Sequence, residues 1–180
     1  MSKLYLITGP CGVGKSTISK RLAKKLEKSV LLEGDDFYHH VVSSYVAAWK
    51  EGNHLDIFWK VVVDTINNYL NTGYDVVFNY IINKNDYEML AKEFANVQTK
   101  FIVLLADGET LLERDSKREE DCQMKERCVI LLNEFLNYGF NEEYLLYENE
   151  LSVDDVVDEI ILNDAFKINE WRWLYAIFWL

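Results

Sequence analysis

A glycine-rich stretch near the start of the chain carries the strongest chemical signal in the sequence. Residues 9–16 read GPCGVGKS and fit the pattern G-x-x-x-x-G-K-[ST], in which backbone N–H groups wrap phosphate oxygens and the lysine reaches the β- and γ-phosphates. Glycines let the backbone come close to a ligand and adopt positive φ. The pattern predicts a Walker A site for a nucleoside triphosphate. The residues expected to bind the nucleotide are Gly9, Cys11, Gly12, Val13, Gly14, Lys15, Ser16 and Thr17.

The surroundings of this loop agree with that interpretation. Residues 3–8 (KLYLIT) predict a buried strand, and apolar positions at helical spacing predict a helix from Ser16 to about residue 28. The helix N-terminus then adds partial positive charge to the anion site. Ser16 is expected to hold Mg²⁺ through its hydroxyl, and Thr17 to add a phosphate contact. A dinucleotide-binding fingerprint is disfavoured because its third glycine position is Thr17 here.

Three acids close the second predicted strand, which covers residues 30–33. The strand ends in Glu33, Gly34, Asp35 and Asp36. Phosphoryl transfer to a hydroxyl uses a group at a strand exit that orients and deprotonates the acceptor. Asp35 is our prediction for this catalytic group. The alternative is that Asp35 or Asp36 only caps the next helix.

One basic cluster lies outside the first helix. Arg114 and Arg118 are four residues apart on a predicted helix and therefore share a face. We interpret residues 106–128 as a lid whose two arginines neutralise charge on the transferring phosphoryl group. The alternative is a solvated helix with surface pairs such as Glu113 with Lys117.

A further magnesium-positioning acid should follow an apolar strand. Asp107 follows the predicted strand at 100–105, but it also suits a helix start. Asn79 ends the apolar run before it and brings no charge. The Walker B acid stays unassigned between these two regions.

The elements needed to position these residues alternate along the chain. Strands are predicted at residues 3–8, 30–33, 74–81, 100–105 and 144–147. Helices are predicted at 16–28, 36–50, 55–71, 85–95, 109–117 and 121–137, with Ser152 and Asp155 forming a capping box before a last helix. Near-continuous apolar strands between helices indicate an α/β, doubly wound parallel sheet. The 180 residues fit a single domain.

Composition limits the partners. The chain has 19 Lys and Arg against 30 Asp and Glu, a net charge of −11, which disfavours duplex nucleic acid. Three cysteines without metal-binding spacing and the lack of a secretory pattern favour a cytoplasmic protein. The apolar tail at 166–180 includes WRWLYAIFWL, which is too short to span a membrane. We expect it to pack on the domain, or else to form a homodimer contact.

The segments GPCGVGKST, LLEGD and LLERDSKR together resemble the small P-loop kinases, which include gluconate kinase, shikimate kinase, adenylyl-sulfate kinase and chloramphenicol phosphotransferase. The chain looks closest to uncharacterised bacterial relatives of the gluconate kinases. The resemblance implies a sheet ordered 2-3-1-4-5, an acceptor-binding role for Asp35 and a lid role for Arg114 and Arg118. The chain lacks the glycine pair of shikimate kinases and the serine- and glutamine-containing stretch of gluconate kinases, so neither substrate is implied.

Together these features predict an ATP- and Mg²⁺-dependent kinase, a transferase that phosphorylates a hydroxyl of a small molecule. A sugar acid, a nucleoside and an antibiotic remain open as acceptors. The alternative is a nucleotide-dependent regulatory ATPase or switch that acts on a protein partner.

Overall fold

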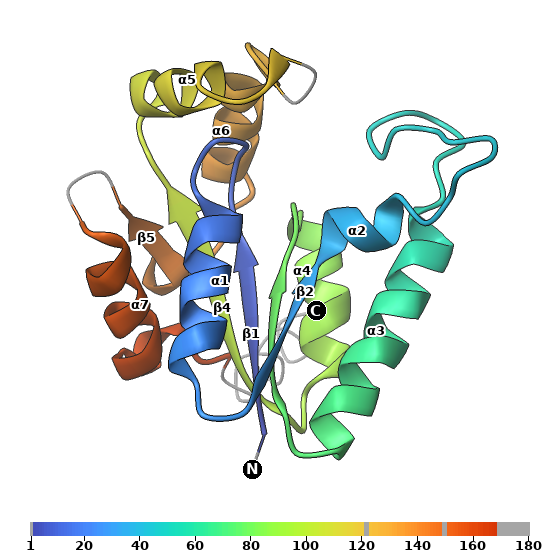
Figure 1. The fold of residues 1–180 in the computed structure, drawn as a ribbon, viewed down its shortest axis with the longest axis vertical. Helices are drawn as coiled ribbons and strands as arrows, with labels where there is room; N and C mark the ends of the chain where they lie inside the picture. Colours follow the sequence, from blue (N-terminus) through green and yellow to red (C-terminus); the bar gives the residue numbers. More distant parts are fainter. Residues whose placement is uncertain (1, 121–122, 149–150, 169–180) are drawn as a thin grey trace, which may run out of the picture.

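Five parallel strands form the centre of the molecule (Figure 1). The computed structural model describes residues 2–120, 123–148 and 151–168. The strands are β1 (Lys3–Thr8), β2 (Ser29–Glu33), β3 (Asp75–Asn79), β4 (Gln98–Leu105) and β5 (Leu145–Tyr147). Their order is β2-β3-β1-β4-β5, so β1 lies between β3 and β4. This arrangement confirms both the α/β class and the order implied by the resemblance to small P-loop kinases.

Helices cover both faces of the sheet (Figure 1). One face carries α1 (Lys15–Lys25) and α7 (Val153–Leu162), and the other carries α3 (Leu55–Asn71) and α4 (Lys84–Glu93). A short α2 (Gly34–Tyr38) directly follows β2. Two further helices, α5 (Gly108–Ser116) and α6 (Arg127–Asn137), lie beyond the carboxyl ends of β1 and β4. Short 3₁₀ turns cover Glu142–Tyr144 and Asp164–Phe166.

Successive side chains of each strand point to opposite faces of the sheet, and an apolar core lies on each face. In β1, Leu4 and Leu6 pack with the apolar residues of α3 and α4, whereas Tyr5 and Ile7 pack with those of α1 and α7. All four side chains are almost completely buried. A strand buried on both faces needs an apolar residue at nearly every position, which is why these runs are recognisable in the sequence.

The predicted helix at 36–50 is wrong, because α2 ends at Tyr38 and residues 39–54 form an irregular segment. The sequence VVSS at 41–44 consists of β-branched and short polar residues with low helix propensity. Ser44 has φ 58°, which a helix does not allow. The hydroxyl of Tyr38 donates a hydrogen bond of 2.7 Å to the carbonyl of Val46 and holds the segment in place.

The predicted helix at 121–137 starts late, at Arg127. Lys125 has φ 49° and interrupts the helical path. The N–H groups of Met124 and Lys125 donate to the Asp115 carboxylate instead of to helical carbonyls. The expected capping box at Ser152 is confirmed, since the Ser152 hydroxyl accepts from the N–H of Asp155.

Within the described ranges, no helix combines the length and the apolar character that crossing a membrane requires. Residues 169–180, with most of the predicted apolar tail, lie outside the described residues. The predicted homodimer contact therefore lies outside them too.

Candidate active site

The phosphate loop joins β1 to α1 in a conformation that requires its glycines. Gly9, Gly12 and Gly14 have φ of 145°, 81° and 89°, values that residues with a Cβ rarely adopt. A Cβ at Gly9 would lie 2.3 Å from the carbonyl oxygen of Leu104, and one at Gly12 would lie 2.8 Å from that of Leu111. The loop is thus packed against the end of β4 and against α5, and it opens onto the N-terminus of α1.

Lys15 lies across this loop. Its ammonium donates hydrogen bonds of 2.9 and 3.0 Å to the carbonyls of Gly9 and Pro10. Burial lowers the pKa of the Lys15 ammonium, while the neighbouring Cys11 and Asp35 act to raise it. Lys15 therefore lies within electrostatic range of Asp35, which comes from a different strand exit.

Ser16 meets an acid that the sequence analysis did not assign. The Ser16 hydroxyl donates to a Glu33 carboxylate oxygen at 3.4 Å, and the other Glu33 oxygen lies 3.3 Å from the Lys20 ammonium. A hydroxyl beside a carboxylate suits Mg²⁺, which takes few protein oxygens and completes its shell with phosphates and water. The signal available in the sequence was the acid two residues before Asp35, at the last position of β2.

Asp35 lies in the first turn of α2 and is exposed. It does not cap the helix, whose N-cap is Glu33 and shows no side-chain cap bond. The pKa of the Tyr80 hydroxyl is raised mainly by burial, and the negative charge of Asp35 raises it further. Gly34 fixes this corner, because a Cβ there would lie 2.5 Å from the ring of Tyr80. The backbone therefore passes close to Tyr80, and Asp35 lies within electrostatic range of Cys11 and Lys15 in the phosphate loop.

Arg118 belongs to the same group of charges. Burial raises the pKa of the Cys11 thiol, while Lys15 and Arg118 act to lower it. Arg118 also lies 3.5 Å from the carboxylate of Asp115. Asp115 is 2% exposed and accepts from the N–H groups of Met124 and Lys125 at 2.8 and 2.7 Å. This carboxylate, which the sequence analysis missed, ties the end of α5 to the start of α6.

Arg114 points to a different partner from Arg118. Its guanidinium pairs with Glu148, which directly follows β5. The structure thus brings Arg118 near the phosphate loop and places Arg114 on the β5 side. Val13 is buried in the loop, and Thr17 is exposed in the first turn of α1.

The two regions considered for a second acid differ in the structure. Asp107 is the N-cap of α5, since its carboxylate accepts from the N–H and the hydroxyl of Thr110 at 2.8 Å each. Asn79 ends β3 in register with Glu33 on β2 and with Ile7 on β1. It is 5% exposed, and its Nδ2 has no partner among the described residues. An uncharged amide therefore stands beside the Ser16–Glu33 pair.

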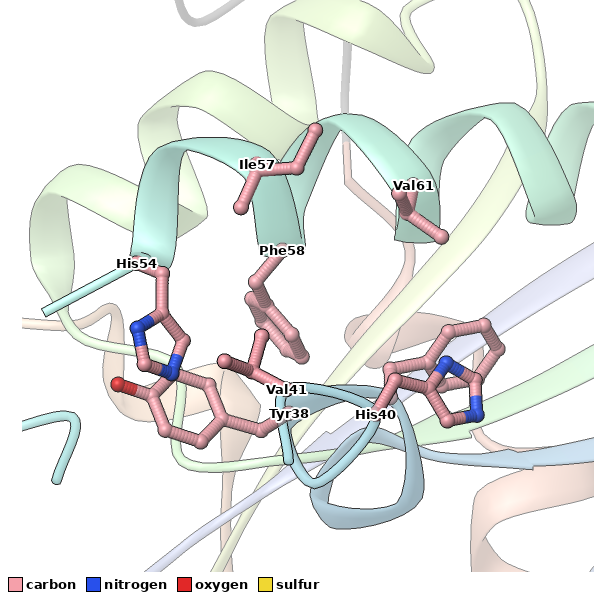
Figure 2. Close-up of a pocket in the computed structure, with 8 residues that line it drawn as sticks. Tyr38, His40, Val41, His54, Ile57, Phe58 and Val61 are labelled. Atoms are coloured by element: carbon pink, nitrogen blue, oxygen red, sulfur yellow. The ribbon is translucent and has the colours of Figure 1, made fainter. Parts of the chain in front are cut away.

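An apolar pocket of about 130 Å³ lies between α2 and α3. Figure 2 shows Tyr38, His40 and Val41 facing Ile57, Phe58 and Val61 of α3. Tyr38 and His54 stack with ring centroids 4.7 Å apart. None of the residues predicted to bind nucleotide line this pocket.

Known proteins share this architecture. The family model of the AAA domain, AAA_18, matches residues 6–135. A search of curated protein sequences found no match. Among solved structures, the tunicamycin resistance protein of Deinococcus radiodurans is 18% identical, covers 89% of this chain and 94% of its own, and has a TM-score of 0.67.

Two kinases give similar values. A sugar kinase from Janibacter sp. HTCC2649 is 16% identical, with coverage of 89% and 93% and a TM-score of 0.67. A gluconokinase from Sinorhizobium meliloti 1021 is 18% identical, with coverage of 88% and 89% and a TM-score of 0.60. At these identities the likeness establishes a shared fold.

Proposed function

We propose that this chain, which belongs to the AAA_18 family of AAA domains, is a kinase. It uses ATP and Mg²⁺ to phosphorylate a hydroxyl of a small molecule. The observation that carries the proposal is that charged groups from two strand exits and from the segment after α5 gather around one loop. Lys15 and Ser16 follow β1, Glu33 and Asp35 lie at the end of β2, and Arg118, just after α5, acts electrostatically on Cys11 and Lys15 in that loop.

The phosphate loop binds the triphosphate. Backbone N–H groups of residues 9–16 and the Lys15 ammonium surround the β- and γ-phosphate oxygens. Ser16 and Glu33 would hold Mg²⁺ through hard oxygen ligands, and the ion would supply positive charge that stabilises the triphosphate. The lysine exchanges its bonds to the carbonyls of Gly9 and Pro10 for bonds to phosphate.

The acceptor side is supplied by Asp35. Its exposed carboxylate at the edge of the loop orients the acceptor hydroxyl and takes its proton. Arg118 stabilises negative charge on the transferring group, and Arg114 remains a predicted second cation once it leaves Glu148. The transition state is loose, so positioning and charge stabilisation contribute more than proton removal.

The similar solved structures suggest which classes of acceptor to test. The similar solved structures are those of a sugar kinase, a gluconokinase and a tunicamycin resistance protein. Sugars, sugar acids, nucleosides and antibiotics with free hydroxyls are therefore the first acceptors to test. The proposal also includes a cytoplasmic location for the protein. It treats the chain as a single domain with a lid at residues 106–128.

The test is ADP release from Mg·ATP with each acceptor, followed by the mass of the product. Lys15→Ala is the blank. We expect one class of acceptor to stimulate ADP release and to gain the mass of a phosphoryl group. Tight ATP binding with no stimulation by any acceptor would instead favour the regulatory ATPase.

Substitutions of Lys15 and Asp35 should reduce the rate of phosphoryl transfer by different amounts. At saturating ATP and acceptor, Lys15→Ala should reduce the rate of phosphoryl transfer more than Asp35→Asn, because charge stabilisation outweighs proton removal. Single-turnover rates for both variants provide the measurement. Equal losses, or a larger loss for Asp35→Asn, would contradict this ordering.

A further inference from the structure

Tyr80, at the exit of β3, presents a hydroxyl group that a ligand can reach. It directly follows the last residue of β3 and is 8% exposed. Within the described ranges its hydroxyl makes no hydrogen bond, and the oxygen remains open to solvent. Tyrosines that are buried to this extent usually have a hydrogen-bond partner for the hydroxyl. The side chain is thus more than nine-tenths buried, while its one polar atom is left available.

Ring packing fixes the position of this hydroxyl. The centre of the Tyr80 ring lies 4.7 Å from that of Phe58 and 5.8 Å from that of Trp59, both on α3. The backbone of Gly34 also passes so close that a Cβ there would lie 2.5 Å from the Tyr80 ring. Contacts with α3 and with the corner between β2 and α2 therefore orient the hydroxyl without a hydrogen bond.

Two carboxylates lie within electrostatic range of the Tyr80 hydroxyl. Burial raises the pKa of Tyr80, and the negative charges of Asp35 and Asp86 raise it further, so the hydroxyl keeps its proton at neutral pH. Asp35 is exposed in α2, and Asp86 is half-buried in the first turn of α4. These helices follow β2 and β3, and both begin at the carboxyl end of the sheet (Figure 1).

The two carboxylates lack the positive charge that would balance them. In the part of the chain that the structure describes, no Lys, Arg or His lies within ion-pair distance of Asp35 or Asp86. Burial raises the pKa of Asp86, and the groups that act to lower it belong to Asn83 and Trp59, which are uncharged. Lys84, close in sequence, lies over two aromatic rings instead. A half-buried carboxylate without a cation is costly, and a cationic ligand would offset that cost.

The chemistry of these groups selects one kind of ligand. Asp35, Asp86 and the Tyr80 hydroxyl all offer oxygen acceptors, and two of the three carry negative charge. An ammonium group has three N–H donors and no acceptor, so it matches such a set. A carboxylate or phosphate on the ligand would instead be repelled by both aspartates.

We propose that the phosphoryl acceptor is an amino alcohol, such as an amino sugar, whose ammonium group binds to Asp86 and to the Tyr80 hydroxyl. Its reacting hydroxyl binds to Asp35, as in the proposed kinase function, on which this inference rests. Because both carboxylates act on the same tyrosine hydroxyl, the amine and the reacting hydroxyl belong to one small molecule.

The experiment observes Tyr80 by NMR in full-length protein labelled with ¹³C at the tyrosine Cζ. The Tyr80 signal is identified as the one missing from Tyr80→Phe, and the phosphate loop is first filled with Mg·ADP. The probes are D-glucosamine, 2-deoxystreptamine and ethanolamine, each compared with its N-acetylated form, which is uncharged. D-glucosamine is also compared with D-glucose, which has a hydroxyl in place of the amine. Calorimetry gives the affinity of each variant.

We expect at least one amine to shift the Tyr80 signal while its uncharged counterparts do not. Asp86→Asn should weaken binding of that amine by about tenfold or more, as expected for loss of a charge-assisted hydrogen bond. Tyr80→Phe keeps the ring and its packing, and should weaken binding by about threefold or more. Glu88→Gln, which removes an exposed negative charge from the same helix as Asp86, should leave it unchanged.

Three results would overturn the proposal: no shift with any amine, an equal shift with the uncharged counterparts, or affinities in Asp86→Asn and Tyr80→Phe equal to that in Glu88→Gln. Failure of the kinase proposal looks different. A protein that binds an amine at Tyr80 and Asp86, yet phosphorylates nothing, would keep the ammonium subsite and lose the kinase function. Phosphorylation of an uncharged acceptor at the same rate in Asp86→Asn as in wild type would do the reverse.

Discussion

The pairing of Ser16 with Glu33 shows how the site depends on single side chains from separate elements. The phosphate loop could be predicted because its eight positions are contiguous and its two fixed glycines, its lysine and its serine each have a known task. Glu33 could not be singled out, because its role depends on the register that brings the end of β2 beside α1.

Glu33 provides the first prediction. Glu33→Gln should weaken Mg²⁺-dependent nucleotide binding by about tenfold or more, because it replaces a charged oxygen ligand with a neutral amide. A Mg²⁺ titration at fixed ATP, followed by nucleotide fluorescence, measures the change. Glu27→Gln, an exposed site just beyond the far end of α1, is the control. Equal effects of the two substitutions would count against a metal-binding role for Glu33.

Gly34 provides a second prediction. In Gly34→Ala the new Cβ would overlap the Tyr80 ring, so the ring or α2 must move, and such overpacking destabilises by about 1–3 kcal/mol. We expect phosphoryl transfer to fall while ATP affinity stays near wild type, because Asp35 moves and the phosphate loop does not. Gly108→Ala has its nearest contact at 3.9 Å and serves as the control. Unchanged transfer by Gly34→Ala would refute this placement of Asp35.

At the level of elements, the strands were predicted more closely than the lid. The bounds of β1 and α3 agree with the sequence analysis because each has a clear period and a clear stop. The segments at 39–50 and 123–126 were predicted as parts of helices, since apolar residues there recur at helical spacing. Hydrogen bonds from Tyr38 to Val46 and from Met124 to Asp115 stabilise their conformation, and the helical period of the sequence does not reveal those bonds.

The lid should depend on the charge of Asp115. Burial acts to raise the pKa of this carboxyl. The N–H groups of Met124 and Lys125 and the Arg118 guanidinium act to lower it, and together they outweigh burial, so the net shift of the pKa is downward. Because the pKa of this carboxyl is lower in the folded than in the unfolded protein, its ionised form stabilises the fold. This stabilisation is fully present at a pH above the unfolded pKa of 3.8, and it is lost as the pH falls through the folded pKa. The start of α6 should therefore loosen only in strong acid.

Asp115→Asn tests this at neutral pH. We expect faster hydrogen exchange of the Met124 and Lys125 amides, because the neutral side chain accepts weaker bonds from them. The exposed Asp64→Asn on α3 should leave their exchange unchanged. Unaltered exchange in Asp115→Asn would mean that other contacts hold this segment.

Lys100 links β4 to α7. It is 4% exposed, and its ammonium donates to the carbonyls of Ile160, Ile161 and Asn163 at 2.8–2.9 Å. Lys100→Met should lower the free energy of unfolding by about 1–3 kcal/mol, because it leaves the helix-end carbonyls without this donor. Chemical denaturation measures it, with exposed Lys92→Met as the control. A loss no larger than that of the control would exclude this role.

For the whole molecule, the sheet order explains why the chemistry gathers at one edge. Because β1 lies between β3 and β4 with β2 next to β3, the ends of β1 and β2 and helix α5 all face the same loop. The net charge of −11 is spread over the chain, whereas Lys15, Arg118 and Arg127 collect around Cys11. This local excess of positive charge in an acidic protein suits a highly charged small ligand.

The measurement that tests the central claim most directly follows the γ-phosphoryl group in water enriched in heavy oxygen. The wild-type protein is incubated with Mg·ATP and the acceptor that best stimulates ADP release. We predict that the acceptor gains an unlabelled phosphoryl group and that Lys15→Ala gives none. Labelled inorganic phosphate with an unmodified acceptor would show that water is the acceptor, and would contradict the account.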